Sequence, residues 1–469
     1  MSLPVLSIAQ MRAWEDATWA AGFSDAEVIR RVGRALVQTA LRLTRAGELI
    51  LVLSGKGNNG ADARATLEFF EDRRVDTLHI IQPEADLGEL EVLLGLQPAL
   101  VIDGLFGIGL NRPLDRAWVR LIECVNAAGC PVLSVDVPSG LNADTGEPMG
   151  AAVVAAVTVS VGAPKRGMLH PAAWPYVGRL EVADEVGLVP GLGQGELNWT
   201  LAGDFRGFRP PRPVAGHKGS FGHLAILAGS TGYHGAAVLS ARGAQRAQPG
   251  LVTLFTEPAV YTPVAAQLQA VMVRPWSTEK GLFAGVSAIL IGPGLAAPEM
   301  PGEIPAFARE VWREADIPVV VDASALDWLG NELPRQGAVR VITPHPGEAG
   351  RLLGVSSGTI QSDRPAAVRA LSAKWGGCVV VLKGYQTVVG RSSGNLFFNS
   401  SGNPQLAQGG SGDVLAGFLA GLLAQPVMGI DSLKTARFAV WAHGHAADRL
   451  SDRSSNWIIE ELVVEIGKC

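Results

Sequence analysis

The chain has 469 residues, of which 48% are hydrophobic and 18% charged, a composition that fits a well-packed globular protein and excludes extensive disorder. The chain is longer than the chains that usually form a single hydrophobic core, so we expect two domains. The formal net charge of −5 comes from 39 basic and 44 acidic residues without a long run of either sign, which gives no electrostatic case for a nucleic-acid partner.

The four cysteines fit a reducing compartment, because Cys124, Cys130, Cys378 and Cys469 form no Cys-x-x-Cys pair and no ligand pattern with histidine. The amino terminus lacks the basic-then-apolar pattern of a signal peptide. No apolar stretch is long enough to span a bilayer. The sequence therefore predicts a soluble cytoplasmic protein that binds no membrane.

The first half alternates short apolar runs with amphipathic stretches. Ser7 and Gln10 form a capping-box pattern that predicts a helix through Trp19. Predicted strands follow at 49–53, 77–81, 100–103, 132–135 and 153–161. Strands separated by helices favour a mostly parallel sheet that is covered on both faces.

Proline and glycine interrupt this rhythm between residues 187 and 213, which is typical of a stiff linker. The α/β pattern then restarts, with predicted strands at 224–227, 252–255, 288–291, 319–321, 340–342 and 378–382. We place the boundary near residue 205, so the expected domains are 1–205 and 206–469. Their loop motifs differ, so the second half is not a repeat of the first.

A glycine-rich loop follows the first predicted strand, and Gly55, Gly57 and Gly60 have the spacing of a dinucleotide fingerprint. The fingerprint also requires an acidic residue at the end of the next strand, where this chain has Gln82 followed by Pro83. An ordinary dehydrogenase is therefore disfavoured. The loop alone leaves open a polar-ligand site, with the Asn58 amide as one contact, or a plain turn.

Two later loops favour the ligand site. Asp103 and Asp136 each end a predicted strand and are followed by glycine-containing loops. Ligands of open α/β sheets bind at the carboxyl ends of the strands, so these loops are expected to converge. Lys165 alone would be an ordinary surface lysine. In a cleft shared with Asp136 it becomes an acid/base partner, and we predict both as catalytic residues.

The segments GKGNNGADA, IDGLFGIGL, SVDVPSGLNADTG and GAPKRG resemble the amino-terminal domain of the NAD(P)H-hydrate repair proteins, an epimerase that acts on hydrated NADH and NADPH. The resemblance implies a Rossmann-like three-layer domain that interconverts the two epimers at the hydroxyl-bearing ring carbon. It also implies a potassium ion bound by Asn59, Asp103 and Ser139. The implied substrate contacts are Asn58, Asn59, Gly60, Ala61, Asp62, Gly107, Ile108, Gly109, Leu110, Asn111, Arg112, Pro113 and Asp136.

The chain departs from this family at two glycines, because the usual Asn-Asn-Gly-Gly-Asp-Gly is replaced by a segment with Ala61 and Ala63. An added methyl group could narrow the pocket or forbid a positive φ. The usual acidic residue ahead of Gly33 is also absent. These departures leave open that the amino-terminal domain binds ligand or mediates oligomerisation without catalysis.

In the second half, the small-residue loop from Gly409 to Gly412 leads into an apolar helix that begins beside Asp413. Free amides and the helix dipole there form an anion site for phosphates. Asp413 could accept a proton from a hydroxyl that attacks the terminal phosphate, or it could only cap the helix. Likewise, Glu348 could reach a phosphate-bound magnesium ion, and His345 could be a plain loop histidine.

The segments HKGSFGHLAILAGS, GYHGAAVLSARGA, IGPGL, VVDASAL, TPHPGEAGRLL, VLKGYQT and GNPQLAQGGSGDVLAG resemble the ribokinase-like fold, and within it the NAD(P)H-hydrate dehydratases. The resemblance implies a three-layer α/β domain that uses ADP or ATP. The implied contacts to the hydrated nicotinamide are Gly235, Ala236, Gly294, His345 and Asp413. The implied nucleotide contacts are Lys383, Gly384, Tyr385, Gln386, Thr387, Asn403, Gly409, Gly410, Ser411 and Gly412.

The implied chemistry converts a poor leaving group into a good one. Phosphorylation of the ring hydroxyl, with Asp413 as base and Mg²⁺ bridging the phosphates, allows the ring nitrogen to expel phosphate and restore NADH or NADPH. A vitamin or sugar kinase fused to a small Rossmann-like domain stays an alternative. The sequence does not decide between ADP and ATP. Its 11 tryptophans favour a homo-oligomer.

Overall fold

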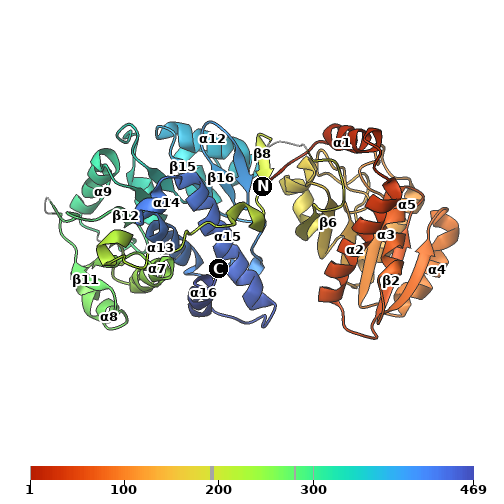
Figure 1. Ribbon diagram of the computed structural model, residues 1–469, viewed down its shortest axis with the longest axis horizontal. Coiled ribbons are helices and arrows are strands. Elements are labelled where there is room, and N and C mark those ends of the chain that lie inside the picture. The colour runs from red at the N-terminus through yellow and green to blue at the C-terminus, as the bar shows by residue number, and fades with distance from the viewer. Residues whose placement is uncertain (1, 191–194, 279–280, 299) are drawn as a thin grey trace. The chain divides into compact units, whose positions relative to one another are not determined.

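The computed structural model describes residues 2–190, 195–278, 281–298 and 300–469 (Figure 1). It contains two compact units, one of residues 3–195 and one of Ser2 with residues 196–469. The division falls at residue 195, where the sequence placed it near 205. Residues 191–194 of the expected linker lie outside the described residues. No described helix is long and apolar enough to cross a membrane.

The amino-terminal unit is built on a parallel six-stranded sheet with the order β3-β2-β4-β5-β6-β7. Its strands are β2 (Leu49–Ser54), β3 (Arg74–His79), β4 (Leu100–Gly104), β5 (Val132–Val135), β6 (Val157–Val161) and β7 (Arg179–Ala183); β1 (Leu3–Pro4) precedes them. The helices are α1 (Ile8–Ala20), α2 (Asp25–Leu43), α3 (Asn58–Ala65), α4 (Pro83–Gly95), α5 (Arg116–Ala127) and α6 (Trp174–Val177), with short 3-10 turns at Thr66–Glu68, Arg166–Leu169 and Pro171–Ala173.

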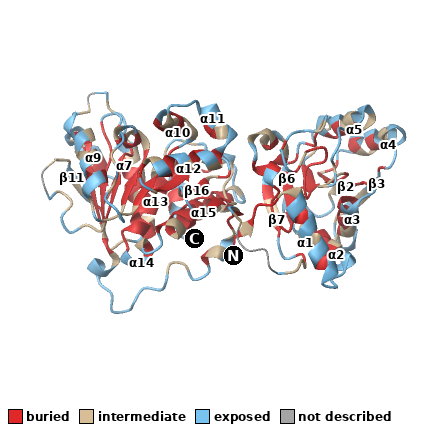
Figure 2. Cartoon of the chain, turned by 90° about the horizontal axis from the view of Figure 1, so that it is seen from above, coloured by how far each residue is buried: buried red, intermediate tan, exposed pale blue. Residues whose placement is uncertain are grey.

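Alternation along the strands supplies both hydrophobic layers of this unit. Ile50 and Val52 of β2 pack in one cluster with residues of α2 and α3. Leu51 and Leu53 point to the opposite face and pack in a second cluster with residues of α4 and α5. The sheet is therefore buried between two helical layers, which is the expected Rossmann-like architecture, and Figure 2 shows the buried strands beneath exposed helix surfaces.

The carboxy-terminal unit has a larger mixed sheet, which runs from β8 to β11 in the order β8-β17-β16-β15-β14-β13-β12-β9-β10-β11. Its strands are β8 (Leu197–Trp199), β9 (His223–Leu227), β10 (Leu251–Thr256), β11 (Met272–Pro275), β12 (Ala288–Ile291), β13 (Val319–Val321), β14 (Arg340–Ile342), β15 (Val379–Leu382), β16 (Val388–Gly390) and β17 (Leu396–Phe398). Pairing is parallel from β15 through β11, and β16 is antiparallel to both of its neighbours.

The helices of this unit are α7 (His234–Ala247), α8 (Tyr261–Ala265), α9 (Glu303–Glu314), α10 (Pro346–Leu353), α11 (Ser357–Ser362), α12 (Arg364–Lys374), α13 (Ser411–Leu423), α14 (Pro426–Gly429), α15 (Ser432–Ser451) and α16 (Ile459–Ile466). Short 3-10 turns lie at Ala202–Phe205, Lys218–Phe221, Pro258–Val260, Ala323–Trp328 and Pro404–Leu406. This order of elements confirms the α/β architecture that the sequence predicted for the second half.

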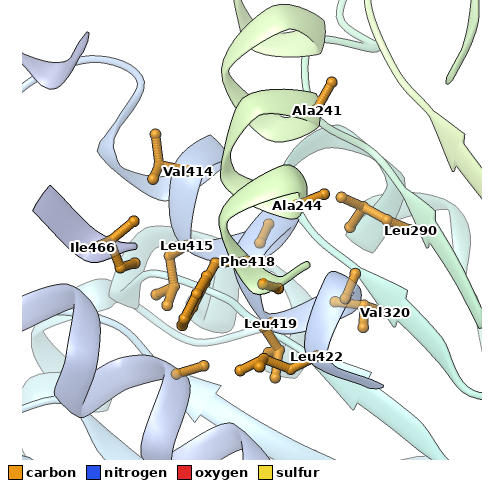
Figure 3. Packing of buried hydrophobic residues seen from close by; sticks show 14 of the residues in the cluster. Ala241, Ala244, Leu290, Val320, Val414, Leu415, Phe418, Leu419, Leu422 and Ile466 are labelled. Carbon is orange, nitrogen blue, oxygen red and sulfur yellow. The ribbon is translucent and has the colours of Figure 1, made fainter. Parts of the chain in front are cut away.

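Helices α7 and α13 pack closely at the centre of the unit. Phe418 and Leu422 of α13 lie in one core with Ala244 of α7 and Leu290 of β12 (Figure 3). The approach requires glycine, because a Cβ at Gly417 would lie 1.9 Å from a backbone oxygen of α7. The small residues of the apolar helix thus fix α13 against α7 and the sheet.

Most predicted elements are confirmed to within a few residues, including α1 with its capping box at Ser7 and Gln10. The predicted strand at 153–161 begins only at Val157. Before it, the Val153 amide donates to the Ser139 carbonyl in a loop and the Ala155 amide donates to the Tyr176 carbonyl in α6, so neither pairs with a neighbouring strand. The sequence prediction omitted strands β1, β7, β8, β11, β16 and β17, which are short or amphipathic segments.

Candidate active sites

The residues predicted to bind a cation lie together at the carboxyl ends of β4 and β5. The buried Asp103 carboxylate accepts hydrogen bonds from the Ser139 amide at 2.9 Å and the Ser139 hydroxyl at 2.5 Å. Asn59 Nδ2 donates to the Phe106 carbonyl at 2.8 Å, and the Phe106 amide donates to Ser139 Oγ at 2.8 Å. Burial raises the pKa of Asp103, and the hydrogen bonds from Ser139 oppose this rise. The cluster therefore presents carboxylate, hydroxyl, amide and carbonyl oxygens around one loop.

Asp136 and Lys165 form a buried ion pair beside this cluster. The Lys165 ammonium also donates to Ser160 Oγ at 3.1 Å and to the Val161 carbonyl at 2.8 Å, so all three of its N–H groups have protein acceptors. Asp136 Oδ1 receives the lysine and the Val161 amide. Asp136 Oδ2 accepts no hydrogen bond from the described residues, which leaves it available to a ligand.

Asp62 is the other buried acid of this region. It is 9% exposed, and its carboxyl group accepts no hydrogen bond from the part of the chain that the structure describes. Burial raises the pKa of Asp62 well above its usual value, and the negative charges of Asp136 and Glu15 raise it further. The carboxyl groups of Asp62, Asp136 and Glu15 therefore lie near Lys165. Of the three, Asp62 and Asp136 were predicted as site residues and Glu15 was not.

The alanines that depart from the family pattern, Ala61 and Ala63, lie within helix α3. Neither has a positive φ, so no glycine is required at these positions for backbone reasons. Ala63 is fully buried against Gly104, where a Cβ would lie 2.4 Å from the Ala63 Cβ. The methyl group of Ala63 thus occupies space that Gly104 leaves empty.

The loop predicted to contact substrate begins next to the cation cluster. A Cβ at Gly107 would lie 3.2 Å from Asn59 Oδ1, and Ile108 packs against the cluster around Met11. The Leu110 amide closes a turn onto the Gly107 carbonyl. The last residues of the loop are exposed: Asn111, Arg112 and Pro113.

In the carboxy-terminal unit, Asp413 lies in the first turn of α13. This helix begins directly after Gly410, which has a φ of 96°. Its carboxyl group is not hydrogen-bonded to any described residue. The pKa of Asp413 is raised to about 7, mainly by burial and in addition by Asp322, while Lys383 acts to lower it. A carboxyl group with this pKa can act as a base near neutral pH, which favours the base interpretation over that of a plain helix cap.

Asp322 is a site residue that the sequence prediction missed, although its position at the end of β13 is a usable signal. Its Oδ1 lies 2.7 Å from Lys383 Nζ and accepts a hydrogen bond from Thr343 Oγ1 at 2.6 Å. Burial lowers the pKa of Lys383, but Asp322 and Glu348 raise it, and the net change is an increase. The Lys383 side chain stays 19% exposed, so its charge is still accessible to a ligand.

His345 and Glu348 cap the start of α10 in a reciprocal way. His345 Nδ1 accepts from the Gly347 amide at 3.0 Å, and Glu348 Oε2 accepts from the His345 amide at 2.7 Å. Glu348 Oε1 lies 3.5 Å from His345 Nε2. His345 therefore has a structural role in the loop, and the second carboxylate oxygen of Glu348 faces the ring of the same histidine.

Three of the residues predicted to contact the hydrated nicotinamide come together at the start of α7: Gly235, Ala236 and Gly294. Gly294 has a φ of 65°, and a Cβ there would lie 2.9 Å from the Ala236 Cβ. Ser230 Oγ donates to the Gly294 carbonyl at 2.6 Å and so fixes this loop. Gly235 has open space around its Cα.

Arg364, which the sequence analysis did not identify, holds the predicted nucleotide loop 383–387. Its guanidinium is buried and donates to the carbonyls of Leu382 at 2.8 Å and Tyr385. Gln386 adopts a φ of 51°, and Thr387 Oγ1 donates to the Gly384 carbonyl at 2.9 Å. The loop is therefore fixed from its backbone, which leaves its outer face for a ligand.

Helix α15 positions the remaining residues that were predicted to contact the nucleotide. Asp448 accepts from the Gly402 amide at 2.9 Å and from Asn403 Nδ2 at 3.1 Å. His443 Nε2 lies 3.0 Å from the Ser411 carbonyl, and burial lowers the pKa of His443 to about 4. A neutral imidazole thus donates to the first residue of α13. These two side chains hold the loops on either side of Gly409.

These features define a class before any relative is considered: a two-domain α/β enzyme with a buried lysine–aspartate pair in its Rossmann-like unit and an anion site with a base in its second unit. Comparison with known proteins gives the family. The chain matches the family described as NAD(P)H-hydrate dehydratase over residues 224–466 and the one described as YjeF-related protein N-terminus over residues 64–167.

Whole-chain relatives carry both regions. The chain is 34% identical to a bifunctional NAD(P)H-hydrate repair enzyme of Coxiella burnetii, over 94% of each chain. It is also 34% identical to the enzyme of that name from Escherichia coli, over 91% of this chain and 85% of the relative. The chain therefore belongs to the family of bifunctional NAD(P)H-hydrate repair enzymes.

Solved structures match the carboxy-terminal half. An ADP/ATP-dependent NAD(P)H-hydrate dehydratase from Bacillus subtilis, co-crystallised with ATP and Mg²⁺, is 32% identical, with a TM-score of 0.50 over 55% of this chain and 92% of that one. A ribokinase-like superfamily protein from Enterococcus faecalis is 25% identical, with a TM-score of 0.51 over 60% of this chain and 97% of that one. The ribokinase-like fold predicted from the sequence is thus confirmed.

Proposed function

We propose that this chain returns hydrated NADH and NADPH to their active forms in two steps. The amino-terminal unit interconverts the two epimers of the hydrate, and the carboxy-terminal unit dehydrates one of them at the expense of ADP or ATP. The single observation that carries the proposal is Asp413 at the start of α13, with a pKa raised to about 7 and the ammonium of Lys383 nearby. Membership of the repair-enzyme family supports both steps.

Dehydration begins with transfer of a phosphoryl group to the ring hydroxyl. Asp413 takes the hydroxyl proton, and backbone amides of the loop from Gly409 to Gly412 stabilise the phosphate charge with the dipole of α13. Lys383 lies at the same end of the sheet and neutralises further charge. The ring nitrogen then expels the phosphate with its lone pair to form a carbon–nitrogen double bond, and loss of a proton from the neighbouring ring carbon restores the reduced nicotinamide ring.

The nucleotide is assigned to the loops 383–387 and 403–412, which Arg364, Asp448 and His443 fix from behind. The Bacillus subtilis relative supports ADP or ATP with Mg²⁺. When bound, Mg²⁺ would supply positive charge that stabilises the nucleotide phosphates. Glu348 fits as its protein contact, directly or through water, because only one of its carboxylate oxygens accepts a backbone amide.

For epimerisation, we assign Asp136 the role of the group that faces the substrate and Lys165 that of a positioning residue. The three hydrogen bonds of Lys165 leave it no donor for a ligand, whereas Asp136 Oδ2 is available. Beside the Asp136–Lys165 pair, the oxygen atoms of Asn59, Asp103 and Ser139 fit a bound potassium ion. Ala61 and Ala63 are compatible with activity because both adopt ordinary helical backbone.

The test is to incubate a mixture of both hydrated NADH epimers with the full-length protein, Mg²⁺ and ADP, ATP or no nucleotide. We expect reduced-nicotinamide absorbance to return only with nucleotide, first in a fast phase and then in a phase limited by epimerisation. The second phase should exceed the rate at which the epimers interconvert without protein. Return of absorbance without nucleotide, or none at all, would refute the dehydratase assignment. A second phase no faster than spontaneous interconversion would refute the epimerase assignment.

A further inference from the structure

The amino-terminal segment is attached directly to the strand-end loop that carries Lys165. The Leu6 amide donates to the Pro164 carbonyl at 2.9 Å, and the Arg166 amide donates to the Leu6 carbonyl at 2.8 Å. This bridge brackets Lys165 between two backbone hydrogen bonds. Ser7 then caps α1, so the helix starts at Ile8, two residues after Leu6, and its position relative to the Asp136–Lys165 pair is fixed.

One face of α1 points into the unit, and its residues follow helical spacing at positions 11, 14, 15 and 18. Met11 is 1% exposed, Thr18 is buried, and Trp14 Nε1 donates to the Val189 carbonyl at 2.9 Å. A Cβ at Gly162 would lie 3.0 Å from the Trp14 ring and 3.3 Å from Met11 Cε. Glu15 is the one acidic side chain on this face, one turn after Met11.

An acid on an inward helix face requires an explanation, because desolvation of a carboxylate is unfavourable. Burial raises the pKa of Glu15; Asp136 raises it further, and Lys165 and Arg12 lower it. Glu15 in turn raises the pKa of Asp62. The carboxyl groups of Glu15, Asp62 and Asp136 therefore interact around a single lysine, and a proton on one of them relieves the repulsion between the others.

We propose that Glu15 is a functional residue of the amino-terminal site, which shares with Asp62 the proton that epimerisation delivers to the ring hydroxyl. The inference rests on the proposed epimerase function and adds a residue to its site. Lys165 is unsuited to this task, since its three N–H groups are bound to protein acceptors. Asp136 is also less suited, because its Oδ1 already accepts from Lys165 and from the Val161 amide.

The step balances without a further reactant. The carboxylic acid protonates the hydroxyl, the carbon–oxygen bond breaks to release water, and the nitrogen lone pair forms a carbon–nitrogen double bond. Water then adds to the opposite face of that carbon, the double-bond pair returns to nitrogen, and the added water gives its proton back to the carboxylate. The product is the other epimer, and the shared proton has been restored.

The experiment compares Glu15→Gln with Asp16→Asn in the full-length protein, using the two-epimer mixture with ADP and Mg²⁺. Both variants remove one negative charge from the same turn of α1, but Asp16 is exposed. We expect Glu15→Gln to slow the second phase by about 10²-fold, the scale of general acid catalysis. The fast dehydration phase should not change. Asp16→Asn should match the unaltered protein in both phases.

The pH profile and a conservative variant separate this role from a structural one. Glu15→Gln should flatten the dependence of the second phase on pH, because Asp62 no longer shares its proton with another acid, whereas Glu15→Asp should restore part of the rate. An unchanged rate and profile in Glu15→Gln would overturn the proposal. If the unaltered protein itself shows no second phase above the spontaneous rate, the proposed epimerase function is wrong. That result is distinct from a second phase that is unaffected by Glu15→Gln.

Discussion

Each unit places a lysine–aspartate pair at the carboxyl ends of its strands, but the two pairs differ in how much of the lysine is left free. Lys165 is fully buried and donates to Asp136, a hydroxyl and a carbonyl. Lys383 is 19% exposed, 2.7 Å from Asp322 and 3.9 Å from Glu348. The first lysine therefore orients a carboxylate, whereas the second keeps a charge that is accessible to a ligand.

The pairs also share a feature, which is a further carboxyl group whose pKa is raised. In the carboxy-terminal unit this is Asp413, and in the amino-terminal unit Asp62 and Glu15 have the same property. Burial is the largest cause in each case, and a neighbouring aspartate adds to it. A lysine held by one acid thus leaves a second acid to exchange protons, and the variants below test that division of roles.

The largest effect is expected from Asp413→Asn. Dehydration should slow by about 10² to 10⁴-fold, because the hydroxyl loses its base when it attacks the phosphate. Nucleotide affinity, measured by titration calorimetry, should change little, since the amides before α13 remain. Turnover at the normal rate would show that Asp413 only caps its helix.

The same carboxyl group sets the pH dependence of the second unit. With a pKa of about 7, the dehydration rate should fall about tenfold per pH unit below 7, as Asp413 becomes protonated. Its folded-state pKa lies above the unfolded value, so the contribution of Asp413 to stability is present at low pH and is lost as the pH rises through 7. Asp413→Asn should therefore raise the unfolding midpoint at pH 8 and not at pH 4. Equal shifts at both pH values would contradict this sign.

Lys165→Met should unfold the amino-terminal unit more easily, by about 3–5 kcal/mol, because it leaves the buried Asp136 without its counter-charge. Chemical denaturation monitored by tryptophan fluorescence measures this change. The double variant with Asp136→Asn is the control, and it should recover part of the stability. If Lys165→Met alone lowered the free energy of unfolding by less than about 1 kcal/mol, the Asp136–Lys165 pair would have to be exposed to water in solution.

Lys383→Met tests the partly exposed ion pair between Lys383 and Asp322. Because Lys383 lowers the pKa of Asp413, its removal should shift the acid limb of the dehydration profile to higher pH. We also expect nucleotide KM to rise about tenfold, the effect of losing one charge-assisted contact to a phosphate. A fall in kcat without either change would indicate that Lys383 serves only to support Asp322.

The sequence predicted the fold well because apolar runs of four to six residues alternate with helices in both halves. It omitted β7 and β16, which lack such a run or are only three residues long. The site loops were predicted because each follows a strand directly. Asp448 and His443 were not predicted, since they act from the second half of α15, and Asp448 accepts a hydrogen bond from Asn403 across 45 residues of sequence. Nothing local marks such partners.

The smallest effect is expected from Ala63→Gly, which restores one glycine of the family pattern. Glycine inside α3 should cost about 1 kcal/mol of stability, since it increases the freedom of the unfolded chain and removes a methyl group packed on Gly104. The epimerisation phase should stay unchanged, because Ala63 is buried behind the loop and has ordinary helical φ. Ala61→Gly is the matched control at a partly exposed position of the same helix. Faster epimerisation in either variant would show that the alanine side chain obstructs the site. The epimerase activity of the amino-terminal unit would then be limited by its departure from the family's glycine pattern.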